Sequence, residues 1–448
     1  MRAALDRCGR VVPVFCFDDR LLSGRHASGP RTQFMIESLA DLDERLGGTL
    51  VFRHGRPERE LATLAGEVRA TELHFSDDSG PFARRRLEHV VAALRDQGVS
   101  GYGHPGLHAV DDLDRIRTGQ GGPYSVFSPF YRSWLRDPRR ELIGRPRSFG
   151  SLPSAVRKGR LPSLSELGLD ERVEEPLPGG ETAGRERLSR FLRSDLRNYA
   201  DNHDALGTDR TSRLSPYLHL GCLSPRELEE RLPAGAGAEA FRRQLCWRDF
   251  YHHVLLHNPR NARSEFQDRY RGSISWSRSE RGFEAWCEGR TGFPLVDAGM
   301  RQLRREGWMH NRARLVVGSF LTKDLGIDWR WGERWFMRWL IDGDEANNNG
   351  NWQWIASVGV DPQPFFRRMY NPARHQERFD PRGDYVRRHV PELRPVPDRY
   401  LAEPWTMPEE VQRDCGCVVG EDYPEPIVDR RVARREANER YGAARSGR

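Results

Sequence analysis

Short apolar segments and amphipathic helical patterns alternate along about the first 125 residues of this 448-residue chain. The apolar segments are rich in β-branched and aromatic residues, and they occur at residues 11–17, 50–52 and 73–75. Apolar residues recur at helical spacing over residues 32–46, 58–68 and 84–97. A strand that alternates with a helix in successive units is typical of a parallel sheet with helices on both faces. The sequence therefore predicts a doubly wound α/β domain at its N-terminal end.

Helical patterns dominate the rest of the chain, after a long stretch without sustained periodicity. Residues 119–180 are rich in proline, glycine, arginine and serine, which is typical of a connection between domains. The clearest later pattern places on one helical face Ala313, Val316, Val317, Phe320 and Leu321. Because 448 residues exceed one ordinary core, we expect an α/β domain at 1–125, a linker at 126–180 and an all-α domain at 181–448.

The composition argues against a membrane-embedded or disulfide-stabilised protein. Mean hydropathy is −0.75, and no apolar run approaches the length of a membrane span. The 7 cysteines show no spacing that would build a zinc or iron–sulfur site. These features predict a soluble protein of the reducing cytoplasm. The net charge of +7 permits contact with a polyanion, and since the only lysines are Lys158 and Lys323, arginine supplies nearly all of the positive charge.

The segment 341–354 places carboxylates, amides and indoles close together. Asp342 and Asp344 flank a glycine, Gly343, which predicts a turn rather than a strand. Three asparagines follow at residues 347–349, and two indoles follow at Trp352 and Trp354. Such a segment is able to hydrogen-bond a polar heterocycle and to stack on a ring.

Two further segments gather polar side chains at or on helices. A string of hydroxyls and an arginine precedes a proline-started helix, and it consists of Thr211, Ser212, Arg213, Leu214 and Ser215. Hydroxyls and free amides at a helix start suit a phosphate group, although the same string also serves as an ordinary helix cap. Farther along, an amide, an indole, a guanidinium and a phenol share one side of a helix at Gln244, Trp247, Arg248 and Tyr251.

Two longer motifs make the pattern specific. They are GFPLVDAGMRQL at residues 292–303 and GWMHNRARL at residues 307–315. Together they resemble the photolyase and cryptochrome flavoprotein family, and within it the class I enzymes that repair cyclobutane pyrimidine dimers. The resemblance covers the linker and the whole helical domain, and it reaches the N-terminal domain through residues 28–32 and 123–131.

The resemblance implies a U-shaped FAD inside the helical domain. The residues expected around this cofactor are Tyr199, Thr211, Ser212, Arg213, Leu214, Ser215, Gln244, Arg248, Asn311, Arg314, Asp342, Gly343, Asp344 and Asn348. Arg314 is expected to pair with Asp342 beside the flavin, where the alternative is an ordinary structural ion pair. Asn348 is expected to hydrogen-bond the reactive isoalloxazine nitrogen in more than one redox state.

The resemblance also implies an electron path and a DNA-binding face. Trp352, Trp329 and Trp276 match the family's tryptophan chain, whereas other tryptophans are expected in the core, at Trp286, Trp308, Trp331, Trp335 and Trp339. Trp247 and Trp354 are expected to sandwich a flipped-out lesion. The full set expected to contact UV-damaged DNA or the lesion is Gln244, Trp247, Arg248, Tyr251, Asn311, Arg312, Trp354 and His375.

Several positions bear on the substrate. Gln244 stands where cyclobutane-dimer enzymes usually have glutamate, which by itself hints at the (6-4) photoproduct branch. Asn311 stands where that branch has histidine, and Asn348 where plant cryptochromes tend to have aspartate. His203 and His375 replace an expected arginine and glutamine. The prediction is therefore repair of cyclobutane dimers by a monomeric flavoprotein, with (6-4) repair, a flavin light sensor or a cofactor-free nucleic-acid binder as alternatives.

The antenna and the start of the chain also depart from the family's pattern. Folate-binding relatives have a cysteine–lysine pair where this chain has Ala262 and Arg263, so a deazaflavin is favoured over methenyltetrahydrofolate, and the absence of an antenna remains open. Residues 1–7 look like the helix that follows the family's first strand. Since that strand is central in a doubly wound sheet, its loss leaves its neighbours with unpaired backbone groups. We expect it to be encoded upstream of Met1.

Overall fold

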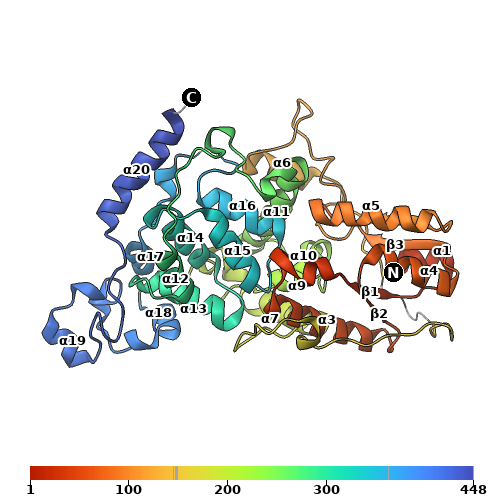
Figure 1. Ribbon diagram of the computed structural model, residues 1–448, viewed down its shortest axis with the longest axis horizontal. Coiled ribbons are helices and arrows are strands. Elements are labelled where there is room, and N and C mark those ends of the chain that lie inside the picture. Colours follow the sequence, from red (N-terminus) through yellow and green to blue (C-terminus); the bar gives the residue numbers. More distant parts are fainter. Residues whose placement is uncertain (145, 147–149, 362, 447–448) are drawn as a thin grey trace.

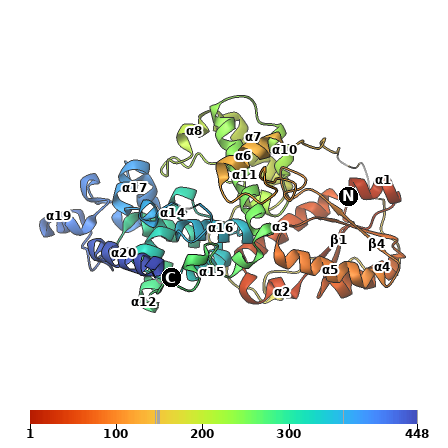
Figure 2. The same ribbon diagram turned by 90° about the horizontal axis from the view of Figure 1, so that it is seen from above.

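The computed structural model describes residues 1–144, 146, 150–361 and 363–446. Its N-terminal part alternates strands and helices, in the order α1 (Arg2–Cys8), β1 (Val14–Phe17), α2 (Asp19–Leu22), α3 (Gly29–Arg45), β2 (Val51–His54), α4 (Pro57–Val68), β3 (Glu72–Ser76), α5 (Pro81–Arg95) and β4 (Ser100–His104). These elements form one end of the molecule in Figures 1 and 2, and the helical part forms the other. The predicted fold class is confirmed.

The parallel sheet is divided into two halves. β1 pairs with β2 in the register Val14↔Val51, and β3 pairs with β4 in the register Glu72↔Ser100. Within the described residues no strand pairing joins β1 to β3. Instead, the amino ends of both strands line a cavity of about 400 Å³, and their remaining lengths line a second cavity of about 580 Å³. The edges of β1 and β3 that face each other thus border open space in place of a strand.

Strand β4 was not predicted from the sequence. Its residues, SGYGH, include two glycines and no aliphatic side chain. A Cβ atom at Gly103 would lie 2.1 Å from Asp77 Oδ1, so a side chain there would require the exposed Asp77 carboxylate to move. Glycine at two of its five positions weakens the pattern by which a strand is recognised.

All other described helices with α geometry belong to the remainder of the chain. They are α6 (Phe127–Arg136), α7 (Glu181–Ser194), α8 (Tyr199–Asn202), α9 (Ser215–His219), α10 (Pro225–Glu230), α11 (Ala236–His257), α12 (Glu280–Glu288), α13 (Pro294–Glu306), α14 (Asn311–Ser319), α15 (Trp329–Trp339), α16 (Glu345–Ile355), α17 (Pro372–Phe379), α18 (Asp384–His389), α19 (Glu409–Cys415) and α20 (Arg430–Ser446). None of the helices in the described part of the chain is long and apolar enough to cross a bilayer.

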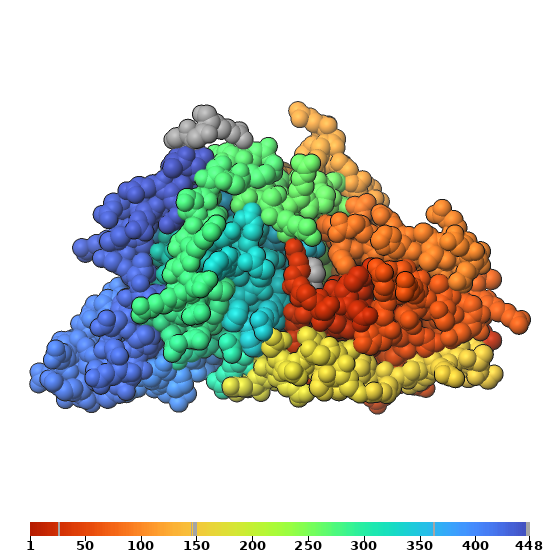
Figure 3. All heavy atoms as spheres, viewed as in Figure 1, coloured from red at the N-terminus to blue at the C-terminus, as the bar shows by residue number. Residues whose placement is uncertain are grey.

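The segment predicted as a linker, 126–180, consists of two structurally different parts. Its first part forms α6, which packs on α11 in an aromatic cluster that includes Phe130, Trp134 and Phe250. Its later part runs along the surface of the α/β domain, where it is yellow in Figure 3. There the backbone N of Phe52 donates to the carbonyl of Lys158 at 2.7 Å. The connection is therefore bound to both domains.

Helix α16 lies at the centre of the helical part, and close backbone approaches fix its position. A Cβ atom at Gly350 would lie 2.1 Å from the ring of Tyr251 on α11. At the other end of α16, the buried Lys323 donates from Nζ to the carbonyl of Ile355. Burial lowers the pKa of Lys323 to about 7. Lys323 lies on a π-helix, Phe320–Asp324, which continues α14 and includes the last two residues of the predicted apolar pattern, Phe320 and Leu321.

Candidate functional site

The segment 341–354 forms a turn followed by helix α16. The predicted turn is present at residues 341–342, but the asparagines and indoles that follow lie on the helix. Asp344 caps this helix, because its Oδ1 accepts from the backbone N of Asn347 at 2.7 Å. Trp352 follows Asn348 by four positions, about one helical turn, so the two side chains share one helical face. One short helix thus presents several of the predicted site residues.

An ion pair lies just before this helix. Arg314 Nη2 lies 2.8 Å from Asp342 Oδ2, and the hydroxyl of Ser215 donates to the same oxygen at 2.6 Å. The Asp342 side chain is 4% exposed. Its second oxygen, Oδ1, is buried and has no hydrogen-bond partner among the described residues. The structure thus contains the predicted pair and leaves one buried acceptor that a ligand donor would satisfy.

The predicted phosphate string, 211–215, leads into α9, of which Ser215 is the first residue. Arg213 has a φ of 50°, in the left-handed region. Its guanidinium pairs with Asp209 and with Glu306, in each case at 2.7 Å between nitrogen and oxygen. Contacts to a phosphate would therefore come from the backbone and hydroxyls of this string. The hydroxyl of Thr211 is buried and has no partner within the described chain.

Asn348 is held by α15. Its Nδ2 donates to the Glu333 carbonyl at 3.0 Å and to the Glu333 carboxylate at 3.2 Å. Burial raises the pKa of Glu333. The donor side of the Asn348 amide is therefore directed at Glu333, and its carbonyl oxygen remains as an acceptor for another group.

The three tryptophans of the predicted electron path differ in burial. Trp352 and Trp329 are 2% and 1% exposed, whereas Trp276 is half-buried. The guanidinium carbon of Arg330 lies 4.8 Å from the centre of the Trp329 ring. Trp276 contacts Tyr441, with 6.3 Å between ring centres. This order of burial is what a path from the interior to the surface requires.

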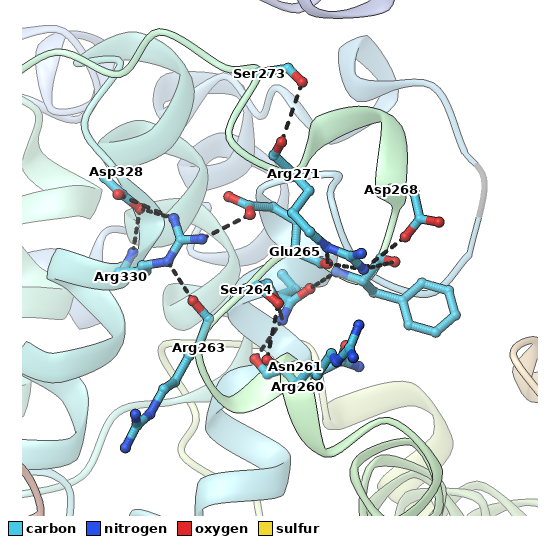
Figure 4. A network of polar contacts seen from close by, with 12 residues as sticks. Arg260, Asn261, Arg263, Ser264, Glu265, Asp268, Arg271, Ser273, Asp328 and Arg330 are labelled. Atoms are coloured by element: carbon cyan, nitrogen blue, oxygen red, sulfur yellow. Dashed lines mark hydrogen bonds and ion pairs between the residues drawn. The ribbon is translucent and has the colours of Figure 1, made fainter.

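Polar contacts hold the segment that leads to Trp276. Arg330 pairs with the buried Glu265 at 2.8 Å and with Asp328 at 3.1 Å, as Figure 4 shows. On the other side, Asn349 and Gln353 of α16 both donate to the carbonyl of Asn261, at 2.8 and 3.0 Å. The network thus ties residues 261–271 to α15 and α16.

The carboxylate of Asp344 faces the interface between the α/β and helical parts. Its Oδ2 lies 3.4 Å from His252 Nε2 and 3.7 Å from His219 Nδ1. Burial alone would raise the pKa of Asp344, but the two facing histidines outweigh it and hold that pKa well below its usual range. Ser79, from the α/β part, lies 2.9 Å from the other ring nitrogen of His252. Asp344 therefore links α16 to the domain interface.

Helix α11 presents its predicted residues in different directions. Gln244 is exposed, and the ring of Trp247 stacks on Phe127 with 3.6 Å between ring centres and 2° between planes. Tyr251 is buried, and burial raises its pKa. The Arg248 guanidinium is directed to the carbonyl of Leu107 at 2.7 Å, towards the domain interface. Gln244 and Trp247 are the members of this group that a bound partner would reach.

The remaining predicted DNA contacts gather around the start of α14 and α17. Asn311 is exposed, and Arg312 pairs with Asp204 and stacks on Phe379, with its guanidinium carbon 4.3 Å from the ring centre. His375 is half-buried, and its Nδ1 lies 2.9 Å from the carbonyl of Asn371, one helical turn earlier. Asn311 is therefore the accessible member of this group.

Comparison with known proteins assigns the chain to a family. Residues 241–443 match the family model of the FAD binding domain of DNA photolyase, and residues 1–147 match the DNA photolyase model. The deoxyribodipyrimidine photo-lyase of Streptomyces griseus is 40% identical over 445 residues, which cover 97% of this chain and 94% of the relative. The chain belongs to the DNA photolyase family. The resemblance inferred from the sequence motifs is confirmed.

Solved structures of photolyases share the fold. A bacterial class III photolyase from Agrobacterium tumefaciens is 35% identical, with a TM-score of 0.89 and coverage of 99% of this chain and 94% of that one. An archaeal photolyase from Sulfolobus tokodaii, described with two FAD molecules, is 32% identical, with a TM-score of 0.84 and coverage of 98% and 95%.

The site geometry fits the flavin that the photolyase family binds. Buried polar atoms without a protein partner in the described chain include Thr211 Oγ1 and Asp342 Oδ1, and both belong to predicted flavin contacts. FAD carries phosphate and ring donors and acceptors that would satisfy such atoms. Tyr199 is buried against Phe191 and Phe241, so it supports this site by packing.

Several residues that shape this photolyase site were not found from the sequence. Glu333 holds Asn348, His252 faces Asp344, and Phe127 stacks on Trp247. Glu333 and His252 are 7% and 3% exposed, and sequence patterns place such polar side chains on a surface. Phe127 lies within residues 123–131, which carry part of the family resemblance. The aromatic content of that segment was the signal that could have identified Phe127.

A buried histidine beside the site should make the protein sensitive to acid. Burial lowers the pKa of His310 to about 4, below the value of about 6.5 expected in an unfolded chain. The unfolded chain then binds an additional proton between these values, so the free energy of unfolding falls as pH falls from 6.5 to 4. The variant His310→Asn keeps an acceptor at this N-cap position and should reduce that loss by about 1 kcal/mol per pH unit.

Urea unfolding at pH 7, 6 and 5 measures this effect. The exposed His89 supplies the control, since His89→Asn should leave the pH dependence unchanged. Equal pH dependence in wild type and His310→Asn would show that His310 is not held neutral.

Proposed function

We propose that this protein is a deoxyribodipyrimidine photolyase, a carbon–carbon lyase that splits cyclobutane pyrimidine dimers in UV-damaged DNA under blue light. The observation that carries the proposal is the set of polar and aromatic side chains on α16 and on the turn that precedes it. Asp342 and Asn348 each present a buried or nearly buried acceptor, and Trp354 lies on the same short helix. Reduced FAD, when bound and excited, supplies the electron that opens the dimer.

The proposed role of the two indoles is to hold the flipped-out lesion. Extruding a damaged base from the stack costs a few kcal/mol, and the cost is smaller for a poorly paired lesion. Stacking on an aromatic side chain contributes about 1 to 3 kcal/mol per base. Trp247 and Trp354 together are therefore able to offset the cost of extrusion. Asn311 and Gln244, both exposed, would hydrogen-bond the base edges.

The proposed role of the buried tryptophans is to return the cofactor to its reduced form. Indoles are readily oxidised side chains, and two of the three are buried while Trp276 reaches the surface. The Arg314 guanidinium beside Asp342 would balance negative charge next to the ring system. We keep the whole set of residues predicted from the sequence as the proposed site, with Arg213 and Arg248 acting through their backbone or by packing.

Light-dependent loss of dimers from a defined oligonucleotide tests the proposal. Purified protein is incubated with oligonucleotides that carry either one cyclobutane dimer or one (6-4) photoproduct, in blue light and in darkness. Restoration of the cyclobutane substrate in light alone is expected. Restoration of only the (6-4) substrate would reassign the lesion, and a coloured protein that repairs neither would favour a flavin light sensor.

Replacing Gln244 with glutamate should raise the repair yield. A glutamine amide donates a hydrogen bond to a base carbonyl, but it has no proton to transfer to the reduced lesion, whereas a glutamic acid does. Because Gln244 is exposed in the free protein, the change should leave stability unaltered. The measurement is the number of dimers repaired per absorbed photon. Equal yields in Gln244→Glu and wild type would contradict the assigned role.

We further propose that the cavity of about 580 Å³ holds a second, antenna chromophore at its end beside the helical part, which leaves the end between β1 and β3 available to a strand. The α/β part contributes aromatic walls, including Phe15, Phe17 and Phe75, and the helical part contributes His219 and His252. Such walls suit a planar heterocycle, and we favour a deazaflavin over a folate. Mass spectrometry of the chromophores released by heat identifies the occupant. Release of a folate, or of FAD alone at one equivalent, would contradict this choice.

Three coarser inferences complete the proposal. The division into an antenna domain at 1–125, a linker at 126–180 and an FAD- and DNA-binding domain at 181–448 is retained as a working description. We infer a monomer that acts on damaged DNA in the cytoplasm. Light scattering of the protein alone and with a lesion-containing duplex measures the number of copies.

A further inference from the structure

Arg368 contacts Trp354, one of the two indoles proposed to hold the lesion. Its guanidinium carbon lies 4.0 Å from the centre of the indole ring, within the range of a cation–π contact. Its Nη1 also donates to the backbone carbonyl of Trp354 at 2.9 Å. One side chain therefore fixes both the ring and the backbone of this residue.

The guanidinium is itself held in place. Arg368 is 2% exposed, and its Nη2 donates to Asp361 Oδ2 at 2.6 Å. Asp361 has a φ of 76°, which a residue other than glycine adopts only when its surroundings require it. The Arg368 carbonyl accepts from the hydroxyl of Ser319 at 2.9 Å. A buried cation with this many fixed partners is not free to reach a DNA phosphate.

The neighbouring arginine is the opposite case. Arg367 is exposed, and its Nη1 donates a hydrogen bond to Gln363 Oε1 at 2.9 Å. An exposed guanidinium of this kind is suited to a phosphate. Two consecutive arginines of one short helix, Phe365–Arg368, thus have different surroundings and serve as matched variants.

The second lesion-binding indole is backed in a similar way. Trp247 stacks in parallel on Phe127, so one of its faces is covered. Arg368 covers one face of Trp354. Tyr251, which lies on the same helix as Trp247, contacts its ring with 5.7 Å between centres and packs on Gly350 of the helix that carries Trp354. Each indole is therefore supported on one face, and Tyr251 packs between Trp247 and the helix that carries Trp354.

We propose that Arg368 is a positioning residue for lesion recognition: it holds Trp354 so that one face of the indole is open to a flipped-out base, and it makes no phosphate contact itself. The inference rests on the proposed function, because it assumes that Trp354 stacks on the lesion. It assigns to Arg368 a contribution to specificity for damage rather than to general affinity for DNA.

Binding measurements over a range of salt concentrations separate these two roles. A phosphate contact contributes to the affinity for damaged and undamaged DNA alike. Its loss reduces the slope of log affinity against log salt by about 1. Loss of a positioning residue lowers the affinity for damaged DNA alone and leaves that slope unchanged. The probes are one duplex with a single cyclobutane dimer and the same duplex undamaged, in the dark.

For Arg368→Met we expect affinity for the dimer-containing duplex to fall about tenfold, with unchanged affinity for the undamaged duplex and an unchanged salt slope. Arg368→Lys should recover part of the loss, because it restores the charge without the planar group. Arg367→Met should lower affinity for both duplexes equally. The tryptophan emission of Arg368→Met should also shift, since the charge beside Trp354 is removed.

Equal losses on both duplexes with a reduced salt slope in Arg368→Met would assign a phosphate contact and overturn the inference, and so would retention of full damage preference. If Arg368→Met does not fold, Asp361→Asn provides the same test, because it removes the charge partner of Arg368 and keeps the guanidinium. A wild-type protein without any preference for the dimer would contradict the proposed function instead.

Discussion

Replacing Asp342 with asparagine should yield a protein that loses FAD during purification and is nearly colourless. The Asp342 carboxylate is 4% exposed and pairs with Arg314 at 2.8 Å. Removing one partner of a buried pair leaves the other charge without compensation, at a cost of about 3 kcal/mol. If that cost falls on the flavin-bound state, affinity for FAD falls roughly a hundredfold.

The measurement is a titration of flavin-free protein with FAD, followed by absorbance or flavin fluorescence. Asp398→Asn is the matched control, because Asp398 pairs with Arg387 at 2.7 Å while its side chain is 79% exposed. That pair should contribute little, and FAD affinity should not change. Thermal unfolding of the flavin-free variants separates loss of cofactor from loss of fold. Wild-type affinity in Asp342→Asn would remove this carboxylate from the flavin site.

A strand added ahead of Met1 should stabilise the α/β domain strongly. The free edges of β1 and β3 border two cavities, of about 400 and 580 Å³, and within the described residues they pair with no strand on that side. A parallel strand of about five to six residues is of ordinary length. Each new hydrogen bond on its two edges contributes about 0.5 to 1.5 kcal/mol. Burial of its apolar side chains adds to this.

Amide hydrogen exchange locates the effect. An extension composed of a β-branched strand and a connecting turn should slow exchange at residues 14–17 and 72–76 and should raise the melting temperature by several degrees. The same extension with proline at alternate strand positions is the control, because proline cannot complete the ladder. Unchanged exchange in β1 and β3 would mean that the gap does not accept a strand.

Regular elements with strong patterns were predictable from the sequence, and elements shaped by tertiary contacts were not. The first three strands and the three longest helices of the α/β part follow apolar periodicity, and they lie within a few residues of their predicted positions. β4 was missed because its residues, SGYGH, include two glycines and no aliphatic side chain. The sequence predicted the turn around Gly343 but not the helix that follows, for which Asp344 is the N-cap.

Contacts within the candidate site were likewise predictable only where sequence motifs marked both partners. The partnership of Arg314 with Asp342 was predictable because both residues belong to recognisable motifs. The directions of Arg213 and Arg248 were not, because they depend on Glu306 and on the Leu107 carbonyl, which are distant in sequence. Arg368 gave no signal at all, since only the fold shows which of two adjacent arginines is buried.

The burial of Lys323 has a practical consequence for optical experiments. Lys158 and Lys323 are the only lysines of the chain, and Lys323 is 0% exposed with its amine directed at the carbonyl of Ile355. Lys158 is 38% exposed and lies in the segment that runs along the α/β domain. Amine-reactive dyes should therefore attach to Lys158 and the chain terminus, without any engineered residue. A fluorophore placed there reports on the α/β end of the molecule while the flavin site in the helical part stays chemically untouched.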